Sequence, residues 1–452
     1  MQRAAASAAA AAAPAKDVDV SEDAASEKKE EPVTIADVNV LNKYKEAARI
    51  AQEALALVLR AAGNGVAVID LAKASDELIV DRTSKLYANK KTVTKGVAFP
   101  TSIGVNNIVG HFCPMEKDQD QPILHTGDIV KIDLGVHIDG FVALVAQTFA
   151  VPAQPGSAQS TPLTGRAADA YAACLVAADA ALKSLRVGRK NQEVSELISK
   201  VASEFGVTPV QGVLSQTLTR HRLDGDKAIL NRLDPEQRID DATFALNDVW
   251  GIDIVMSTGE GKPKEVDNRQ TTIYKRNAAV NYSLKTATSR GIFSEILQKY
   301  SQLPFSLRYL TDANKARFGI AEAREHDLVY AYPVLHEKEG EVVAQVKFTV
   351  LLTASGPQRI TGPIGGLEFN PNVVQASKKF KDFGAELQTA LKALTIAPAA
   401  AAGSGDAAAA AAAPAEGAEA GAAGANAAKN KKKKEAQAKK KAAEAAAAAA
   451  AK

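Results

Sequence analysis

The chain has 452 residues and a net charge of only +3, from 55 basic and 52 acidic side chains. Its two cysteines, Cys113 and Cys174, are far apart and show no metal-type spacing, which excludes a small disulfide-stapled secreted protein. There is no run of eighteen apolar residues, so no membrane insertion is expected. The length exceeds that of a usual single core and predicts either one large two-lobed domain or two domains.

The two ends differ in composition from the middle of the chain. Residues 1–32 are alanine-rich and then acidic, and residues 396–452 are mostly alanine, glycine and lysine. Both have too few large apolar side chains to offset the entropy of ordering, so we predict disordered tails around a domain at 33–395. The block at 429–441 carries eight lysines and is either an interaction tail or a solubilising one.

Apolar periodicity predicts alternating pairs of helices and groups of strands. A helix pair precedes strands in both halves, which predicts an α+β fold with internal pseudo-duplication, in which helices back a curved antiparallel sheet. The predicted helices cover 33–63 (after the N-cap candidate Thr34), 67–87, 162–187, 190–205, 284–300, 311–325 and 371–394, and the strand-rich segments cover 96–112, 131–149, 243–276 and 341–356.

The segment "KIDLGVHIDGFVALVAQTF" at 131–149 has the pattern of a β-hairpin with a turn near Asp139-Gly140. A turn at 138–139 would place Leu144 directly opposite Asp133, and a turn at 139–140 would make the two residues diagonal neighbours on one face. In both cases leucine lies where a second carboxylate would complete a metal chelate with Asp133.

Two further charged residues interrupt apolar strands: Asp253 in "GIDIV" and Lys347 in "AQVKFTVLL". Buried carboxylates are costly unless they are paired, so Asp133 and Asp253 suggest a shared polar centre. Alternation favours an outward, snorkelling Lys347. The alternative is that its ammonium group neutralises both carboxylates.

The motifs "AFPTSIGVNN", "HFCP", "KIDLGVHIDGF", "STGEGK" and "AQVKFTVLL" occur in this order and resemble the methionine aminopeptidases of the pita-bread fold, most of all the type 2 branch. The resemblance implies the pita-bread (creatinase/aminopeptidase) fold. Those enzymes hold two divalent ions with Asp, Asp, His, Glu and Glu. In this chain the five positions are Asp133, Leu144, Gln216, Asp253 and Lys347.

These substitutions argue against a metal centre. Leucine has no donor atom, glutamine is a weak ligand, and an ammonium group 4 Å from a dication costs about 8 kcal/mol at an effective dielectric of 20. His111 matches the catalytic histidine of the enzymes, but their other active-site histidine is Asp224 here. We therefore expect no bound metal, no cofactor and no aminopeptidase activity.

The stretches "DLGVHIDGF", "GEGKPK", "TTIYKR", "KTATSR" and "EKEGEVVAQVKFTVLL", together with the lysine-rich C-terminus, are similar to the proliferation-associated, ErbB-receptor-binding family. That resemblance implies a non-catalytic protein that binds the large ribosomal subunit near the nascent-chain exit and structured RNA, acts in translation, ribosome biogenesis and growth, and meets regulatory proteins. It also implies a monomer in the cytoplasm with a nuclear and nucleolar fraction. Gln216 is a departure, because relatives are expected to have histidine there.

Basic residues in probable loops suit phosphate contacts, which position RNA without reading its sequence. A solvated basic face is the alternative, and no RNP1 motif is present. Tyr274 is available for stacking on a base. The predicted RNA-binding residues are Lys90, Lys91, Lys95, Lys262, Lys264, Arg269, Lys275, Arg276, Lys431, Lys432, Lys433 and Lys434.

Two alternative functions are compatible with the same residues. One is an active metal-dependent methionine aminopeptidase with an unusual site. The other is a protein-interaction regulator that uses the former substrate pocket for a partner's peptide.

Overall fold

A computed structural model describes residues 33–396 except 117, 119–120, 159–160, 267–269 and 369. The predicted tails, and with them Lys431–Lys434, lie outside the described residues, so the domain boundaries stay predictions. None of the helices in the described part is long and apolar enough to cross a membrane.

The helices are α1 (Val38–Ala61), α2 (Val68–Lys85), α3 (Gly165–Ser184), α4 (Asn191–Phe205), α5 (Ala287–Lys299), α6 (Ala313–Glu325) and α7 (Ala385–Ile396), with short 3₁₀ helices η1 (Leu307–Tyr309) and η2 (Phe380–Asp382). The strands are β1 (Lys95–Val105), β2 (Ile108–Gly110), β3 (Ile129–Ile138), β4 (Phe141–Ala150), β5 (Thr208–Pro209), β6 (Leu214–Thr217), β7 (Ala228–Leu230), β8 (Val249–Ser257), β9 (Lys264–Glu265), β10 (Ile273–Arg276), β11 (Phe305–Ser306), β12 (Val329–Tyr332), β13 (Leu335–His336), β14 (Val343–Thr353) and β15 (Gly356–Arg359).

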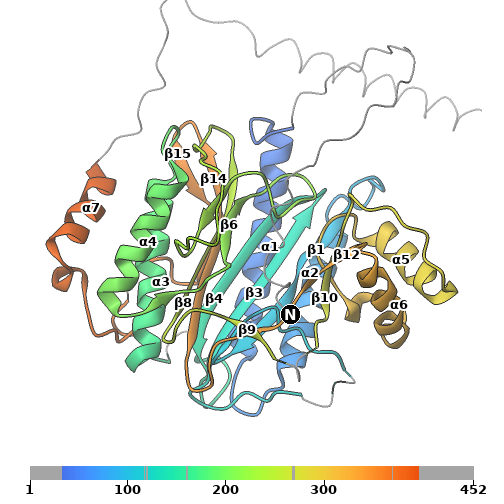
Figure 1. The fold of residues 1–452 in the computed structure, drawn as a ribbon, viewed down its shortest axis with the longest axis horizontal. Coiled ribbons are helices and arrows are strands. Elements are labelled where there is room, and N and C mark those ends of the chain that lie inside the picture. The colour runs from blue at the N-terminus through green and yellow to red at the C-terminus, as the bar shows by residue number, and fades with distance from the viewer. Residues whose placement is uncertain are drawn as a thin grey trace, which may run out of the picture. The chain divides into compact units, whose positions relative to one another are not determined.

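One large antiparallel sheet, with the order β1-β3-β4-β14-β8-β6-β7, forms the centre of the molecule (Figure 1). α1 packs on β3 and β4, and α3 packs on β8 and β14, so each helix pair covers one half of the sheet. The halves meet where β14 pairs with β4, through Lys347 and Ala146. The predicted duplication therefore places Lys347 at the seam between the two halves.

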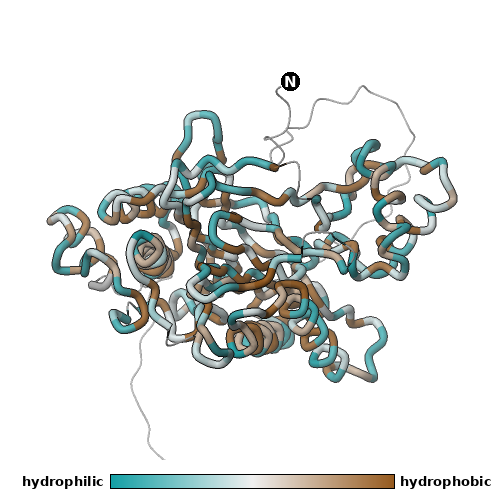
Figure 2. Tube along the Cα trace, turned by 90° about the horizontal axis from the view of Figure 1, so that it is seen from below, coloured by the Kyte–Doolittle hydropathy of each residue, from teal (hydrophilic) through white to brown (hydrophobic). Residues whose placement is uncertain are grey.

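Side chains alternate between the two faces of this sheet. Ile132, Leu134 and Val136 of β3 pack in the core beneath α1 and α2. Ile252 and Ile254 of β8 pack in the second core beneath α3 and α4. Hydrophobic segments accordingly gather in the middle of the molecule in Figure 2, whereas the peripheral loops are hydrophilic. The opposite face of the sheet is left for the polar side chains of the site.

The hairpin turn consists of Asp139 and Gly140, since Ile138 pairs with Phe141. Both turn residues have positive φ, 56° for Asp139 and 80° for Gly140, as a two-residue hairpin turn of the right twist requires. Asp133 therefore pairs directly with Ala146, and the diagonal alternative for Leu144 is the correct one.

α5 and α6 pack on each other, and their side chains share a core with those of the small sheet β11-β10-β12. A buried ion pair between Arg308 of η1 and Asp76 of α2 fastens this part to the first half of the body. The same carboxylate accepts hydrogen bonds from the Tyr309 hydroxyl at 2.7 Å and from the Thr101 amide at 3.1 Å. Asp76 is thus fully satisfied, which fixes the orientation of the attached helices.

Two predicted helix boundaries are wrong. α1 begins later than predicted, because the cap is Asp37, whose Oδ1 accepts from the Asn39 amide at 2.8 Å, rather than Thr34. The predicted helix 371–394 is helical only from Ala385 as α7. Residues 371–384 contain turns and η2 instead, and Leu163 exchanges backbone hydrogen bonds with the neighbours of Val374, a tertiary contact that overrides local helix propensity.

Candidate functional site

The charged residues predicted to share a polar centre lie within four consecutive strands of the large sheet, β3-β4-β14-β8. Within the large sheet, Asp133 on β3 and Lys347 on β14 both pair with Ala146 of β4. Lys347 also pairs with Asp253 of β8. Since directly paired residues point to the same side of a sheet, all three side chains project onto the face opposite the helices. Three sequence segments more than 90 residues apart are thereby brought together.

The Lys347 ammonium group bridges the two carboxylates. It forms an ion pair with Asp133 Oδ2 and another with Asp253 Oδ2 at 2.9 Å. The three side chains are only 11–14% exposed. The expectation of an outward, snorkelling lysine is therefore wrong, and the alternative of a neutralising ammonium group is confirmed.

Gln345 belongs to the same centre, although it was not predicted from the sequence. Its Nε2 donates to Asp253 Oδ1 at 2.9 Å and approaches Asp133 Oδ2 at 3.4 Å. The available signal was its position two residues before Lys347 on the same strand face. Asp133 Oδ1 is buried and has no hydrogen-bond partner among the described residues.

Burial and pairing determine the charges in this centre. Burial raises the pKa of Asp133 to about 6, an effect opposed by Lys347 and reinforced by Asp253. Burial acts to lower the pKa of Lys347, but the two carboxylates outweigh it and raise that pKa above its usual value. The ammonium group therefore stays charged at neutral pH, and Asp133 keeps its proton to a higher pH than an ordinary aspartic acid does.

Leu144 fills the floor of the site. A β-carbon built on Gly135 would lie 2.6 Å from Leu144 Cδ2, and one on Gly251 would lie 3.3 Å from Leu144 Cδ1. The leucine side chain thus lies over Gly135 of β3 and Gly251 of β8 and is buried. Gln216 on β6 pairs with Gly251 and is half-buried at the edge of the same region.

His111 lies beside the ion centre in an aromatic cluster with Phe99 and Tyr332. Its ring centroid is 5.2 Å from that of Tyr332 and 6.1 Å from that of Phe99. Nδ1 contacts the Pro333 carbonyl oxygen at 3.0 Å, and burial lowers the pKa of His111 to about 4 despite this contact. His111 is therefore neutral near pH 7. The Lys347 ammonium lies 5.6 Å from the Phe99 ring centroid.

The residues at the five metal-ligand positions do not fit a pair of divalent ions. Two of the five are carboxylates, and both are engaged by Lys347. In the described ranges no group of three or more His, Cys, Asp or Glu side chains is placed to hold a metal. A dication would have to displace the ammonium group and would find leucine on one side.

Comparisons with known proteins agree with this architecture. A model of metallopeptidase family M24 matches residues 42–225. The chain is 46% identical over 336 residues to ErbB-3 binding protein 1 of Arabidopsis thaliana, covering 74% of this chain and 83% of the relative. It is 39% identical over 374 residues to proliferation-associated protein A of Dictyostelium discoideum, covering 82% and 92%. The solved structure of a thermophilic Arx1 matches with a TM-score of 0.71 at 28% identity, covering 79% of this chain and 98% of that chain.

The chain belongs to the ErbB-3-binding, proliferation-associated protein family. The family and the pita-bread fold predicted from the motifs are thereby confirmed. Within the metallopeptidase fold, this family member has an ammonium group and a leucine at positions where the resemblance implies acidic ligands.

The predicted RNA-binding residues differ in accessibility. Lys90 and Lys91, in the loop after α2, are exposed, as are Lys262 and Lys264 at β9. Lys95 is not free in this way, because its ammonium group donates to the Ser84 carbonyl at 3.1 Å and to that of Leu86.

Two further predicted RNA contacts, Lys275 and Arg276, lie on β10. Lys275 is paired with Asp224, the residue at the position of the enzymes' second histidine, and only 11% of its side chain is exposed. Arg276 is half-buried, and Arg269 lies outside the described residues. Tyr274 is buried in the core beneath α5 and α6, so the expectation that it is available for stacking is wrong. The accessible part of the predicted set is Lys90, Lys91, Lys262 and Lys264.

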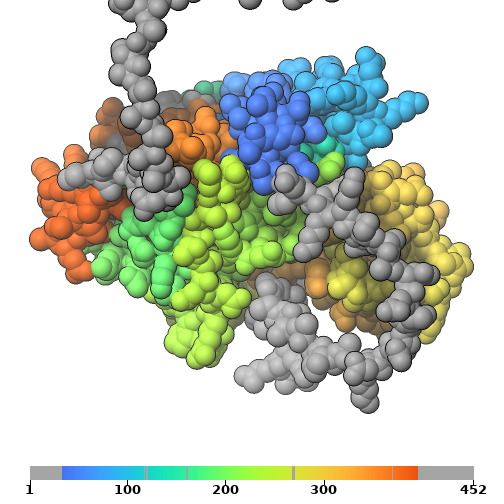
Figure 3. Space-filling view, turned by 90° about the horizontal axis from the view of Figure 1, so that it is seen from above, coloured from blue at the N-terminus to red at the C-terminus, as the bar shows by residue number. Residues whose placement is uncertain are grey.

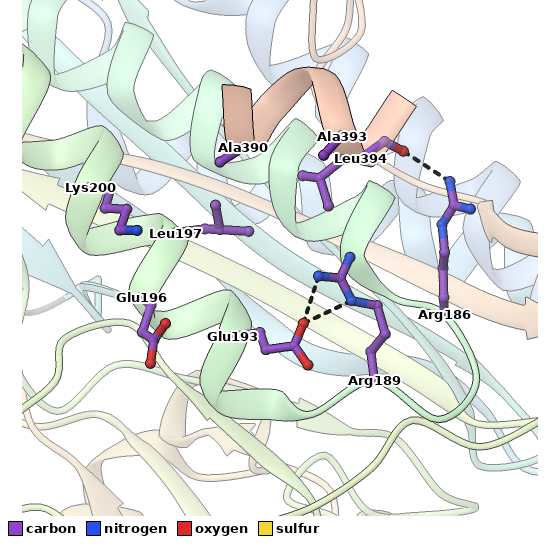
Figure 4. A pocket seen from close by; sticks show the side chains of 9 residues that line it. All are labelled: Arg186, Arg189, Glu193, Glu196, Leu197, Lys200, Ala390, Ala393 and Leu394. Carbon is purple, nitrogen blue, oxygen red and sulfur yellow. Dashed lines mark hydrogen bonds and ion pairs between the residues drawn. The ribbon is translucent and has the colours of Figure 1, made fainter. Parts of the chain in front are cut away.

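A surface groove lies away from the ion centre, between α4 and α7 (Figure 4). Leu197, Ala390 and Leu394 are among its lining residues. Arg189 donates to Glu193 Oε2 through two nitrogens, at 2.9 and 2.6 Å. Glu193 thus neutralises the Arg189 guanidinium, so Arg189 can be compared with arginines that have no carboxylate partner.

Replacing Lys347 by methionine should destabilise the protein. The substitution removes the charge but keeps most of the apolar stem, and it leaves two carboxylates facing each other at a buried site. We expect a loss of about 3–5 kcal/mol in the free energy of unfolding, measured by urea denaturation. Lys338→Met is the control, because Lys338 is 64% exposed in its ion pair and its loss should cost less than about 1 kcal/mol. Equal midpoints for Lys347→Met and the parent would contradict the bridging role.

The ion centre should also produce a specific pH dependence. The raised pKa means that folded Asp133 holds its proton more tightly than unfolded aspartate, so its contribution to stability falls as the pH rises from about 4 to about 6. In Asp133→Asn this component is absent. As the pH rises across that range, the free energy of unfolding of the parent should therefore fall relative to that of Asp133→Asn. Denaturation at several pH values measures this difference. A pH-independent difference would show that Asp133 does not titrate there.

Proposed function

We propose that this protein is a non-catalytic member of the aminopeptidase fold that binds the large ribosomal subunit near the nascent-chain exit and structured RNA, and that acts in translation, ribosome biogenesis and growth control. The single observation that carries the non-catalytic part is the Lys347 ammonium group between Asp133 and Asp253. The binding part rests on membership of the proliferation-associated family and on the accessible lysines.

The chemistry of the centre supports loss of hydrolysis. Metal-dependent peptidases need an ion that lowers the pKa of a bound water and polarises the scissile carbonyl. Here the carboxylates at the ligand positions already neutralise a protein cation, and Leu144 offers no donor atom. His111 keeps the position of a catalytic histidine, but it has no activated water to serve.

Accessible lysines on separate loops support contact with an RNA surface. Lys90 and Lys91 project from the α2–β1 loop, and Lys262 and Lys264 lie around β9. Lysine side chains on loops suit backbone phosphates, whose recognition depends on charge and shape rather than on base identity. We further propose that the lysine block at 429–441 adds to this attraction, that the protein is a monomer, and that it occupies the cytoplasm with a nuclear and nucleolar fraction.

Ribosome association should depend steeply on salt and on the exposed lysines. The full chain should co-sediment with large ribosomal subunits, and Lys262→Gln/Lys264→Gln should reduce the slope of log affinity against log salt by about 1.5, since each phosphate contact contributes roughly 0.7–0.9. The matched control is Lys183→Gln/Lys200→Gln, which removes the same charge from α3 and α4, where both lysines are paired with acids. Co-sedimentation that is insensitive to salt would point to a protein-mediated contact instead.

The purified protein should neither retain metal nor release methionine. After incubation with cobalt or manganese and dialysis, elemental analysis should find no stoichiometric ion, and a short peptide that begins with methionine should stay intact. The positive control restores the pattern of the enzymes with Leu144→Asp, Gln216→His, Asp253→Glu and Lys347→Glu, which should increase metal retention. Stoichiometric metal together with methionine release in the parent would return this protein to the hydrolases.

A further inference from the structure

Arg359 is the last residue of β15, which pairs with β14 at the margin of the large sheet. It is half-buried and precedes the glycine-rich segment "TGPIGG" at 361–366. Figure 3 shows this part of the chain, in orange, beside the blue α1 on one face of the molecule. The contact is direct, since the Gly362 amide donates to Gln52 Oε1 of α1 at 3.1 Å.

Among the described residues, the Arg359 guanidinium has almost no hydrogen-bond acceptors. A guanidinium has five N–H donors. In Arg359, Nη1 donates to the Thr361 carbonyl oxygen over a long 3.5 Å. No carboxylate among the described residues forms an ion pair with it. Asp179 influences it only at a distance and is itself held by Lys183 at 2.6 Å. Burial lowers the pKa of Arg359, as expected for a cation without a compensating anion.

Three arginines that are paired with carboxylates provide a contrast. Arg308 is paired with Asp76, Arg220 with Asp139 at 2.6 Å, and Arg189 with Glu193 at 2.6 Å. Polar groups removed from water are normally hydrogen-bonded. A guanidinium held at a half-buried position with most of its donors unused is therefore suited to an acceptor that comes from outside the chain.

The glycine-rich segment is built to hold this guanidinium close to the backbone. A β-carbon at position 362 would lie 2.0 Å from Arg359 Nη1, so any side chain there would push the guanidinium aside. A β-carbon at 366 would lie 4.0 Å from Nη2. Besides Gln52, the Gln147 amide oxygen anchors the segment by accepting from the Ile364 amide at 2.7 Å. The exposed Gly365 leaves the approach to the segment without a side chain.

We propose that Arg359 and the segment 362–366 form a binding site for a phosphate group. A planar guanidinium matches two phosphate oxygens at once, and the glycines leave room for a phosphate to approach it. The phosphate belongs either to an RNA backbone or to a free phosphate ion. The site does not depend on ribosome association, because its residues are distinct from the accessible lysines at 90–91 and 262–264.

The test is calorimetric titration of the full-length protein with inorganic phosphate at constant ionic strength. The parent should bind phosphate, and Arg359→Gln should weaken the affinity about tenfold or more, since a charge-assisted bidentate partner is lost. Arg359→Lys keeps the positive charge but loses the planar guanidinium. Its phosphate affinity should therefore lie between those of the parent and Arg359→Gln. Gly362→Ala keeps the arginine but displaces the guanidinium and should also weaken binding. Arg189→Gln, which removes an arginine that already has its carboxylate, should bind as the parent does.

A second arm uses a short unstructured RNA, followed by fluorescence anisotropy, to identify the source of the phosphate. If inorganic phosphate gives no signal but Arg359→Gln weakens RNA binding relative to Arg189→Gln, the site takes an RNA phosphate. If phosphate binds and RNA binding is the same in both variants, the ligand is a free phosphate. Equal behaviour of Arg359→Gln and the parent in both arms overturns the proposal, as does an equal heat with acetate, which would indicate general anion binding. If the parent does not co-sediment with ribosomes, the proposed function is contradicted, but the proposed phosphate site is not.

Discussion

One buried interaction organises this molecule: the ammonium group of Lys347 lies between the carboxylates of Asp133 and Asp253, at the seam where the two halves of the sheet meet. Like charges repel strongly in a poorly solvated site, and β3 and β8 each contribute one carboxylate. In the enzymes that the chain resembles, two dications hold such carboxylates together. In this protein a side chain of the sheet supplies the cation, so the integrity of the seam no longer depends on a ligand from solution.

The surroundings are adapted to this change. Leu144 fills the space over Gly135 and Gly251 with apolar atoms, so the floor of the site is packed by side-chain contact rather than by coordination. Gln345 donates to Asp253 and so satisfies a lone pair that a metal would otherwise take. Because these replacements act together, reverting one of them would leave a mismatched site. The change from acid to lysine at position 347 is therefore best understood as one part of a repacked centre.

The sequence predicted most elements because their apolar periodicity coincides with the layers of the fold, and the Asp139-Gly140 turn because two successive positive φ values require such residues. It did not predict which lysines are free. Lys95 and Lys275 occur in the same kind of basic stretch as Lys90 and Lys264, but tertiary contacts give them carbonyl and carboxylate partners. The alternation of apolar and polar residues also predicted that Lys347 points outward into solvent. Alternation shows on which face of a strand a side chain lies, but it does not show which groups cover that face. Residue types in the sequence identified the candidate charged residues. Contacts between residues far apart in the sequence determined which of these residues are paired and which are accessible.

The distribution of satisfied and unsatisfied charge indicates where the described part of the protein can act on other molecules. At one of the positions that match the enzymes' metal ligands, Lys347 is neutralised by the chain itself, and Arg308, deep against α2, is neutralised by Asp76. A group whose charge is already balanced gains little from an external partner, since any new contact must first displace the existing one. Within the described structure, Arg359, Lys262 and Lys264 form no ion pair with a carboxylate, and they lie away from the buried ion centre. Recognition by this protein should therefore use its outer surface, while the buried ion centre holds the strands beneath that surface together.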